Sequence, residues 1–341
     1  MVRARGATWR ALSAAAGLAA IIGAGGAGAR ERLDGFNVIA VPDHGFGTPS
    51  ATQALVAAKH MGAVAIAIVP FLWQPDTASP QLVRGNDMPD ADLRAAIRDV
   101  HRLGLVAVVK PHVWVPGSWA GAIAPESEPA WRTWFARYRA EIVRLAQVAA
   151  EEGADAFAIG TELVKTTQRP EWSEVIAAVR TVFAGTLFYV AHNAEEAEAV
   201  RFWRDLDLIG VTLYPTLGAA EDAAGRQAVM AAVARRLDTL AARDHKPIVV
   251  AEIGLRSAKD ATLKPWESPE ERRAEPDPTI QAEVLAEWLK VLDRPAVRGV
   301  LIWRMLSDPD AGGPADTDFT VQGKPAEAML RCAWTLNCGR P

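Results

Sequence analysis

The amino-acid sequence predicts an α/β fold, a closed (β/α)8 barrel in a single domain, on three observations. Short apolar runs alternate with longer amphipathic segments, which is typical of buried parallel strands joined by helices. The sequence contains eight such runs. Its length of 341 residues also fits, since single-domain barrels of this kind commonly have about 250 residues or more.

The eight predicted strands are spread along the whole chain, and six amphipathic segments between them are predicted to be helices. The strands are residues 36–41, 63–69, 105–109, 156–159, 187–191, 208–213, 248–251 and 300–303. The helices are residues 50–61, 91–103, 130–152, 171–183, 223–243 and 279–293. An open doubly wound sheet shares this alternation, but the strand count favours a barrel. Residues 41–47 (VPDHGFG) also lack the glycine spacing that cradles a dinucleotide.

The first 29 residues have the composition of a secretory signal peptide. Arginines within the first ten residues precede an apolar stretch over residues 11–22, and small residues at 27–29 allow cleavage before Arg30. Residues 11–29 are also long enough for a retained membrane anchor, but they are rich in Gly and Ala rather than Leu, which favours cleavage. We therefore expect a secreted or periplasmic protein, without stable membrane insertion after cleavage, whose residues 30–341 form the barrel domain.

Charge and cysteine content exclude several classes of partner. The 37 Lys and Arg residues and 41 Asp and Glu residues give a net charge of -4 and form no blocks, which disfavours a nucleic-acid partner. Cys332 and Cys338 lie close enough in sequence to form a disulfide loop, although two free thiols remain an alternative. Without a nearby His or third Cys, the pair is not expected to bind a metal. We expect a monomer.

Two glutamates follow predicted strands at the same edge of the barrel. Glu162 ends the segment AIGTE after the fourth strand, and Glu252 lies in VVAEIG at the seventh. Either glutamate alone is more commonly a salt-bridge partner or a helix cap. However, barrel enzymes keep their chemistry at the C-terminal ends of the strands. A facing pair of carboxylates suits cleavage of a glycosidic bond, with one acid and one nucleophile about 5 to 5.5 Å apart in retaining enzymes.

Other polar and aromatic side chains follow the same strands and are predicted to bind substrate. A basic neighbour would help separate the pKa values of the two carboxyl groups, and a tyrosine hydroxyl would hold the nucleophile in its charged form. Twelve tryptophans against three tyrosines, several of them in predicted loops, favour a saccharide, because indole faces stack on sugar rings. The predicted substrate-binding residues are Lys110, His112, Trp114, Asn193, Tyr214 and Trp303.

The sequence around these residues resembles glycoside hydrolase family 113, best known for endo-β-1,4-mannanases, within the clan A retaining glycosidases. The resemblance rests on residues 109–114 (VKPHVW), 160–163 (GTEL) and 312–326 (GGPADTDFTVQGKPA), and it covers residues 35–335. It implies a TIM barrel, an oligo- or polysaccharide substrate, and neither cofactor nor metal.

Carried over to this sequence, the resemblance implies a role for each matched residue. Glu162 would be the acid/base and Glu252 the nucleophile, with Tyr214 as the hydrogen-bonding neighbour of the nucleophile. Trp303 would form the floor of the cleavage subsite, and Lys110, His112 and Asn193 would contact sugar. Thr161 departs from the wider clan, in which most members carry Asn before the acid, so recognition of the sugar 2-hydroxyl is left open.

The sequence leaves three alternatives to a retaining glycosidase. A metal-dependent barrel hydrolase would use His44, Lys110, His112, His192 and Glu252, but His44 stands alone where a His-X-His pair is usual. A polysaccharide-binding protein without activity would be expected to lose one carboxylate, and both are present. A third alternative is an enzyme that processes or transglycosylates an exopolysaccharide.

Overall fold

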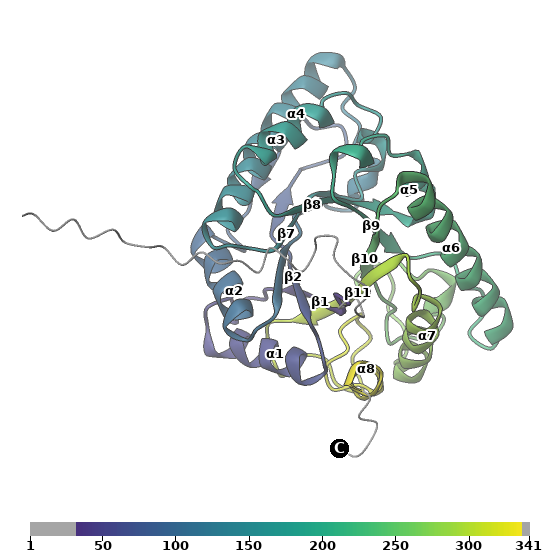
Figure 1. The fold of residues 1–341 in the computed structure, drawn as a ribbon. Helices are drawn as coiled ribbons and strands as arrows, with labels where there is room; N and C mark the ends of the chain where they lie inside the picture. Colours follow the sequence, from purple (N-terminus) through teal and green to yellow (C-terminus); the bar gives the residue numbers. More distant parts are fainter. Residues whose placement is uncertain (1–31, 336–341) are drawn as a thin grey trace, which may run out of the picture.

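The structure is a computed structural model that describes residues 32–335. Eight parallel strands form a closed barrel in the order β1-β11-β10-β9-β8-β7-β5-β2, and pairing of β1 with both β11 and β2 closes the ring (Figure 1). Each strand overlaps one of the eight predicted runs, so the predicted (β/α)8 fold is confirmed. The barrel strands are β1 (Gly35–Ile39), β2 (Ala65–Ile68), β5 (Val106–Val109), β7 (Ala156–Thr161), β8 (Thr186–His192), β9 (Leu208–Leu213), β10 (Ile248–Ile253) and β11 (Val297–Leu306).

Helices surround the barrel, and the start of several is encoded locally. Thr48, Ser127 and Asp277 each accept a hydrogen bond from a backbone N–H of the first turn, and a proline follows within two residues. The α-helices are α1 (Pro49–His60), α2 (Asp90–Arg102), α3 (Glu128–Glu151), α4 (Trp172–Arg180), α5 (Asn193–Ala199), α6 (Ala223–Asp244), α7 (Pro278–Val291) and α8 (Pro325–Thr335). Short 3-10 helices are η1 (Ala120–Ala122), η2 (Val164–Thr166), η3 (Trp203–Asp205) and η4 (Ala261–Leu263).

The core has two parts. A cluster of mostly small and medium side chains, including Ala65, Ala67, Ala156 and Ala158, comes from alternating positions of the strands and fills the barrel interior. A larger cluster lies between the strands and the helices. Since the interior is filled by side chains, polar chemistry is confined to the rim, where the strands end.

A small second sheet extends from this rim. It consists of β3 (Phe71–Trp73), β4 (Val83–Arg84) and β6 (His112–Trp114), in the order β4-β3-β6. Strands β3 and β6 follow the second and third barrel strands directly and pair in parallel, whereas β3 and β4 pair antiparallel. We call it the rim sheet. The sequence patterns did not predict it.

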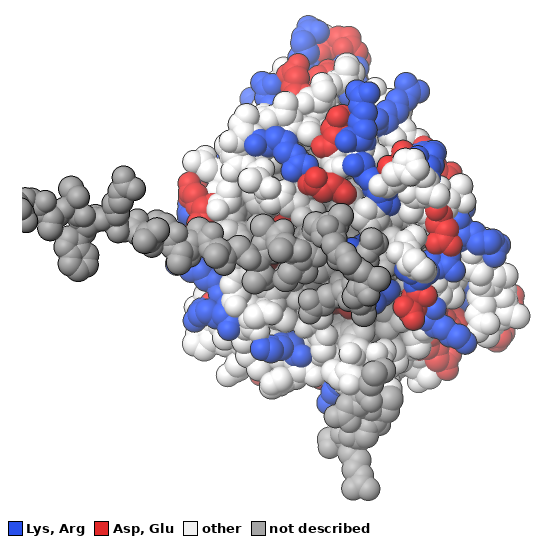
Figure 2. Space-filling model, in the orientation of Figure 1, with Lys and Arg blue, Asp and Glu red and all other residues white. Residues whose placement is uncertain are grey.

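Some predictions fall outside the described residues. The predicted signal peptide (residues 1–29) and Cys338 lie in segments that the structure does not describe, so signal cleavage, export and the disulfide loop stay predictions. Among residues 32–335, no helix is long and apolar enough to cross a membrane. On the face drawn in Figure 2, basic and acidic side chains are interspersed and no large area has a single sign.

Candidate active site

Glu162 and Glu252 lie at the C-terminal ends of β7 and β10, the fourth and seventh strands of the barrel in chain order. Both side chains are largely buried, each residue being 6% exposed. Glu162 has a left-handed backbone with φ of 56°, which is uncommon for a residue other than glycine. The chain therefore leaves β7 by a sharp turn at this glutamate.

Each oxygen of Glu252 accepts a hydrogen bond from a buried side chain. The hydroxyl of Tyr214 donates to Oε1 at 2.9 Å, and Nζ of Lys110 donates to Oε2 at 2.6 Å. Burial, followed by the charge of Glu252, raises the pKa of Tyr214 well above its usual value, so the phenol keeps its proton and remains a donor. Lys110 is fully buried and lies 5.2 Å from the centre of the Trp303 ring. An ammonium group and a phenol thus provide an environment suited to a carboxylate.

Glu162 accepts three hydrogen bonds, from a hydroxyl, an imidazole and an indole. Oε1 accepts from the Thr212 hydroxyl at 2.6 Å and faces Nδ1 of His192 at 2.9 Å, and Oε2 accepts from the indole N–H of Trp119 at 2.9 Å. Burial alone would raise the pKa of Glu162, but His192, His112 and Thr212 together outweigh burial and lower that pKa below its usual value. Glu162 is therefore ionised in the free protein.

The neighbouring Asn193 determines which nitrogen of His192 carries the proton. The backbone N–H of Tyr214 donates to Asn193 Oδ1 at 2.8 Å, which leaves Nδ2 facing Nε2 of His192 at 3.0 Å. Because a backbone N–H can only donate, the Asn193 amide group cannot be flipped, and Nε2 must accept from Nδ2. With Nε2 as the acceptor, the proton of the neutral ring lies on Nδ1, where it donates to Glu162.

Two influences on His192 oppose each other. Burial lowers the pKa of His192, and the hydrogen bond and charge of Glu162 more than reverse this effect and raise it. The amide of Asn193 counteracts that increase, because a proton on Nε2 would set two donors against each other at 3.0 Å. The fixed orientation of Asn193 therefore favours the neutral ring, whereas the charge of Glu162 favours the protonated one.

Behind the rim, a buried hydrogen-bond chain supports the turn at Glu162. The N–H of Leu163 donates to the Tyr189 hydroxyl at 2.8 Å, and that hydroxyl donates to Glu196 Oε1 at 2.6 Å. The other oxygen of Glu196 accepts from the backbone N–H of His192 at 2.5 Å. Burial is the largest influence on Glu196 and raises its pKa to about 7.

The structure places the predicted substrate-binding residues in different surroundings. His112 has a buried Nδ1 without a hydrogen-bond partner, and burial lowers the pKa of its ring. The peptide bond between Trp303 and Arg304 is cis. The side chain of Trp114 is exposed on the rim sheet. Lys110 and Asn193 have protein partners in the free protein, so their contact with a sugar stays a prediction.

Sequence reasoning missed four residues that contact or support Glu162. Thr212 and Tyr189 were placed within predicted strands, where the alternation of side chains between the two faces of the sheet gave no reason to separate them from the core. Trp119 is one of the tryptophans in the predicted loops, but nothing in the sequence links it to the acid. Glu196 lies in the polar segment NAEEAEA, whose composition is that of an exposed helix.

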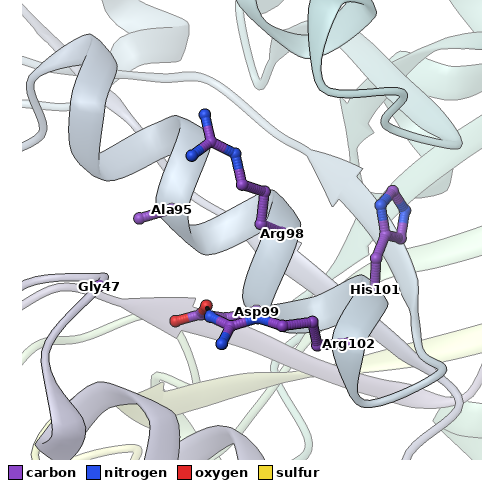
Figure 3. A pocket seen from close by; sticks show the side chains of 6 residues that line it. All are labelled: Gly47, Ala95, Arg98, Asp99, His101 and Arg102. Atoms are coloured by element: carbon purple, nitrogen blue, oxygen red, sulfur yellow. Dashed lines mark ion pairs between the residues drawn. The ribbon is translucent and has the colours of Figure 1, made fainter.

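A second pocket, outside the barrel, lacks the features of a ligand-binding site. It lies between Gly47 and helix α2, and its basic side chains Arg98, His101 and Arg102 are shown in Figure 3. Each is already paired with a carboxylate, of Glu152, Asp155 and Asp99 respectively. No cation there is left to bind an anionic ligand. Within residues 32–335, no group of three or more His, Cys, Asp or Glu side chains is placed to hold a metal ion.

Comparisons with known proteins extend these observations. The family model of Glycoside Hydrolase Family 113 matches residues 38–324. No curated protein sequence matches the chain. Among solved structures, the GH113 β-mannanase from Alicyclobacillus acidocaldarius, in complex with ManMIm, has a TM-score of 0.78 at 23% identity, covering 90% of this chain and 98% of that chain.

Two further structures share the fold. A GH113 β-1,4-mannanase complex has a TM-score of 0.76 at 24% identity and covers 89% of this chain and 99% of that chain. The β-glucuronidase from Ruminococcus gnavus, in complex with D-glucuronic acid, has a TM-score of 0.59 at 12% identity and covers 89% of this chain and 50% of that chain.

Proposed function

The chain belongs to glycoside hydrolase family 113, and from this membership we propose that it cleaves a β-1,4-linked mannan-like glycan with retention of configuration. The observation that carries the proposal is the pair of buried rim carboxylates with different partners, Glu252 beside a buried ammonium group and Glu162 beside neutral donors. The two mannanase structures with the same fold support the substrate class.

In the first step, Glu252 is the nucleophile and Glu162 the general acid. A carboxylate oxygen of Glu252 attacks the anomeric carbon, the bond between that carbon and the glycosidic oxygen breaks, and Glu162 gives its proton to the departing oxygen. In the second step, water attacks the glycosyl ester and Glu162 takes the proton of that water. The Glu252 carboxylate is released, and the anomeric carbon of the product has the same configuration as in the substrate.

Oxygen Oε2 of Glu162 is the better placed to carry the transferred proton. Oε1 is hydrogen-bonded to Thr212 and His192. Oε2 accepts its hydrogen bond from the indole N–H of Trp119, a partly exposed side chain. A departing sugar oxygen that replaces this indole contact removes a donor from Glu162 and so favours its protonated form. Substrate binding and protonation of the acid are then linked.

Replacement of the two glutamates tests the roles directly. We expect Glu162→Ala to lower kcat/KM by about 10² to 10⁴-fold, the usual contribution of a general acid, and Glu252→Ala to lower it at least as much. Azide should partly rescue Glu252→Ala and give a glycosyl azide of inverted configuration, because the anion fills the space of the missing nucleophile. Unfolding curves matching the wild type would exclude a folding defect, and full activity in either variant would contradict the assignment.

The substrate and the mechanism are tested together with defined oligosaccharides. We expect β-1,4-linked manno-oligosaccharides to be cleaved, with the β-anomer of the product appearing first in the NMR spectrum. An α-anomeric product would contradict the double displacement. Binding without turnover across β-mannans, β-glucans and amino-sugar polymers would favour the alternative, a polysaccharide-binding protein. Longer products from an exopolysaccharide would instead indicate transglycosylation.

A further inference from the structure

The rim sheet has one aromatic face that the proposed catalytic roles do not use. Side chains alternate across β3 and β6, so that Leu72 and Val113 are buried on one face. The register pairs Phe71 with His112 and Trp73 with Trp114, which places these four rings on the other face. Their ring centres are close neighbours, at 6.0 Å for Phe71 and His112, 6.1 Å for Phe71 and Trp114 and 6.2 Å for Trp73 and Trp114.

The outer rings of this face are exposed, yet one of them is held in a fixed orientation. Trp73 and Trp114 are 36% and 46% exposed. The indole N–H of Trp73 donates to Asp87 Oδ1 at 3.1 Å. The ring also lies against Gly85, where an added Cβ would be 2.4 Å from the indole nitrogen. An exposed indole that is oriented before any ligand binds loses little freedom on binding, which is how rigid aromatic anchors gain affinity.

The inner end of the same face reaches the candidate catalytic centre. The carbonyl of Pro111, the residue before His112, accepts a hydrogen bond at 3.0 Å from the hydroxyl of Thr161, the residue before Glu162. Trp114 lies two residues further along β6, which corresponds to about 7 Å in a strand and is comparable to the length of a sugar ring. The four aromatic rings therefore lead outward from the carboxylates as a continuous surface.

We propose that Trp73 and Trp114 form a distal subsite that binds a backbone sugar of the glycan, beyond the bond that is cleaved. This subsite deepens the proposed function and rests on it for the identity of the glycan. Stacking of the apolar face of a pyranose on an indole requires no charge, and the charged group that accepts the hydrogen bond of the Trp73 indole, Asp87, is an anion. The ligand is therefore a neutral glycan rather than a uronic acid polymer.

The test compares long and short substrates in the same variant. We expect Trp73→Ala and Trp114→Ala to lower kcat/KM for mannohexaose by roughly tenfold, the value of one good aromatic contact, mainly through KM. In Trp73→Ala, the value for the shortest manno-oligosaccharide that the wild type cleaves should stay within about twofold of the wild type. An unchanged ratio of long to short substrate, with wild-type activity present, would overturn the subsite and leave the proposed function intact.

Three further variants separate stacking from general damage. Trp73→Phe keeps an aromatic ring and should retain most of the preference for mannohexaose, whereas Gly85→Ala pushes the indole out of place and should lose part of it. Trp131→Ala is a matched control, since this indole lies on α3 under the guanidinium of Arg169, 5.0 Å away, and it should leave the ratio unchanged.

A binding measurement keeps the two proposals distinguishable if no turnover is found. Affinity electrophoresis in gels with mannan, β-glucan or polygalacturonate needs no catalysis, and it uses the Glu252→Gln protein with and without Trp73→Ala. Retardation by a neutral polymer that is lost in the double variant would support the subsite even where cleavage fails. Equal retardation of both proteins, retardation by polygalacturonate alone, or no retardation at all would overturn it.

Discussion

The protonation of Glu162 depends on the donors that face its two oxygens, and Trp119 is the one that can be removed most simply. Trp119→Phe keeps an aromatic ring at this position but deletes the N–H that donates to Oε2. The loss of one hydrogen bond to a carboxylate should raise the pKa of Glu162 by about one unit. We therefore expect the alkaline limb of the kcat/KM profile, which reports the acid in the free enzyme, to move to higher pH.

The same pH profile distinguishes this effect from simple damage to the site. Thr212→Val deletes the donor to Oε1 and should move the limb in the same direction, whereas Trp131→Phe, in the first turn of α3, should leave it in place. A profile of Trp119→Phe that is lower at every pH but unshifted would mean that the indole N–H does not control the proton on Glu162.

Glu196 is a second residue whose titration follows from its surroundings. Its folded pKa of about 7 exceeds the usual value of 4.5, so the folded state holds the proton more tightly than the unfolded chain does. This contribution to stability is fully present below about pH 4.5 and is lost as pH rises through 7, with a total of up to about 3 kcal/mol. Since Glu196→Gln stays neutral, its stability relative to the wild type should rise across this interval.

Denaturant unfolding at several pH values measures this difference. The neighbouring Glu195→Gln is the matched control, because Glu195 is exposed and paired with Arg236 on the surface. A constant difference in free energy of unfolding between wild type and Glu196→Gln, from pH 4.5 to 8, would contradict the assignment of the proton to Glu196.

The residues of the candidate site differ in how far sequence could reveal them. Glu162 and Glu252 were found because a charged residue at the end of an apolar run has no packing reason to be there. Thr212 and Tyr189 have small or apolar signatures that are compatible with any strand, and only the barrel register brings them to the acid. The role of Asn193 in fixing the His192 tautomer depends on one backbone N–H, which no sequence pattern specifies.

At the level of elements, strand β7 is positioned by aromatic side chains of α3 and α4 that pack onto its glycine. A Cβ on Gly160 would lie 2.8 Å from the Tyr138 hydroxyl and 3.0 Å from the Trp172 ring, while that hydroxyl donates to the carbonyl of Ile159 at 2.8 Å. Gly160→Ala should therefore destabilise the fold by about 1 to 3 kcal/mol through overpacking.

Because Gly160 precedes Glu162 by two residues, the same change should also lower kcat. Urea unfolding and steady-state kinetics of Gly160→Ala measure the two effects. Gly153→Ala is the control, because it adds a Cβ to a glycine near this strand without steric crowding: nothing lies within 4 Å of a Cβ there. Any loss of stability in this variant reports the backbone strain of an alanine at a φ of 72°. If Gly160→Ala has wild-type stability and kcat, the side chains of Tyr138 and Trp172 can move aside without displacing Glu162, which would contradict the prediction.

Elements with strong periodicity were predicted well, and those held by tertiary contacts were not. All eight barrel strands coincide with apolar runs, because strands buried on both faces need continuous apolar sequence. Helix α5 is polar and only seven residues long, and it forms where Glu196 turns inward. The rim sheet uses strands of two and three residues, which are too short for any alternation to be read from sequence.

At the level of the whole molecule, the barrel closes by parallel pairing of its first and last strands, and the loops at its rim are tied together as well. Buried Lys324 precedes α8 and reaches Ser257, in the loop after β10, with Nζ 2.7 Å from its hydroxyl. The same ammonium contacts Asp316 Oδ1 at 3.0 Å and the carbonyl of Asp318 at 3.0 Å. One cation thus joins the loops that follow the seventh and eighth barrel strands, and the first of these loops begins next to Glu252.

Lys324→Met tests whether this cation stabilises the barrel as one unit. The variant keeps most of the side-chain volume but leaves Asp316, Ser257 and a carbonyl without their donor, which should cost about 3 kcal/mol. In a domain of this size that corresponds to a decrease in Tm of roughly 4 to 6 °C. Because a closed barrel has no free edge at which one part can separate, we expect calorimetry to record a single transition at the lower temperature. A new early transition with the main Tm unchanged would mean that the two loops unfold on their own, and that the barrel beneath Glu252 does not depend on them.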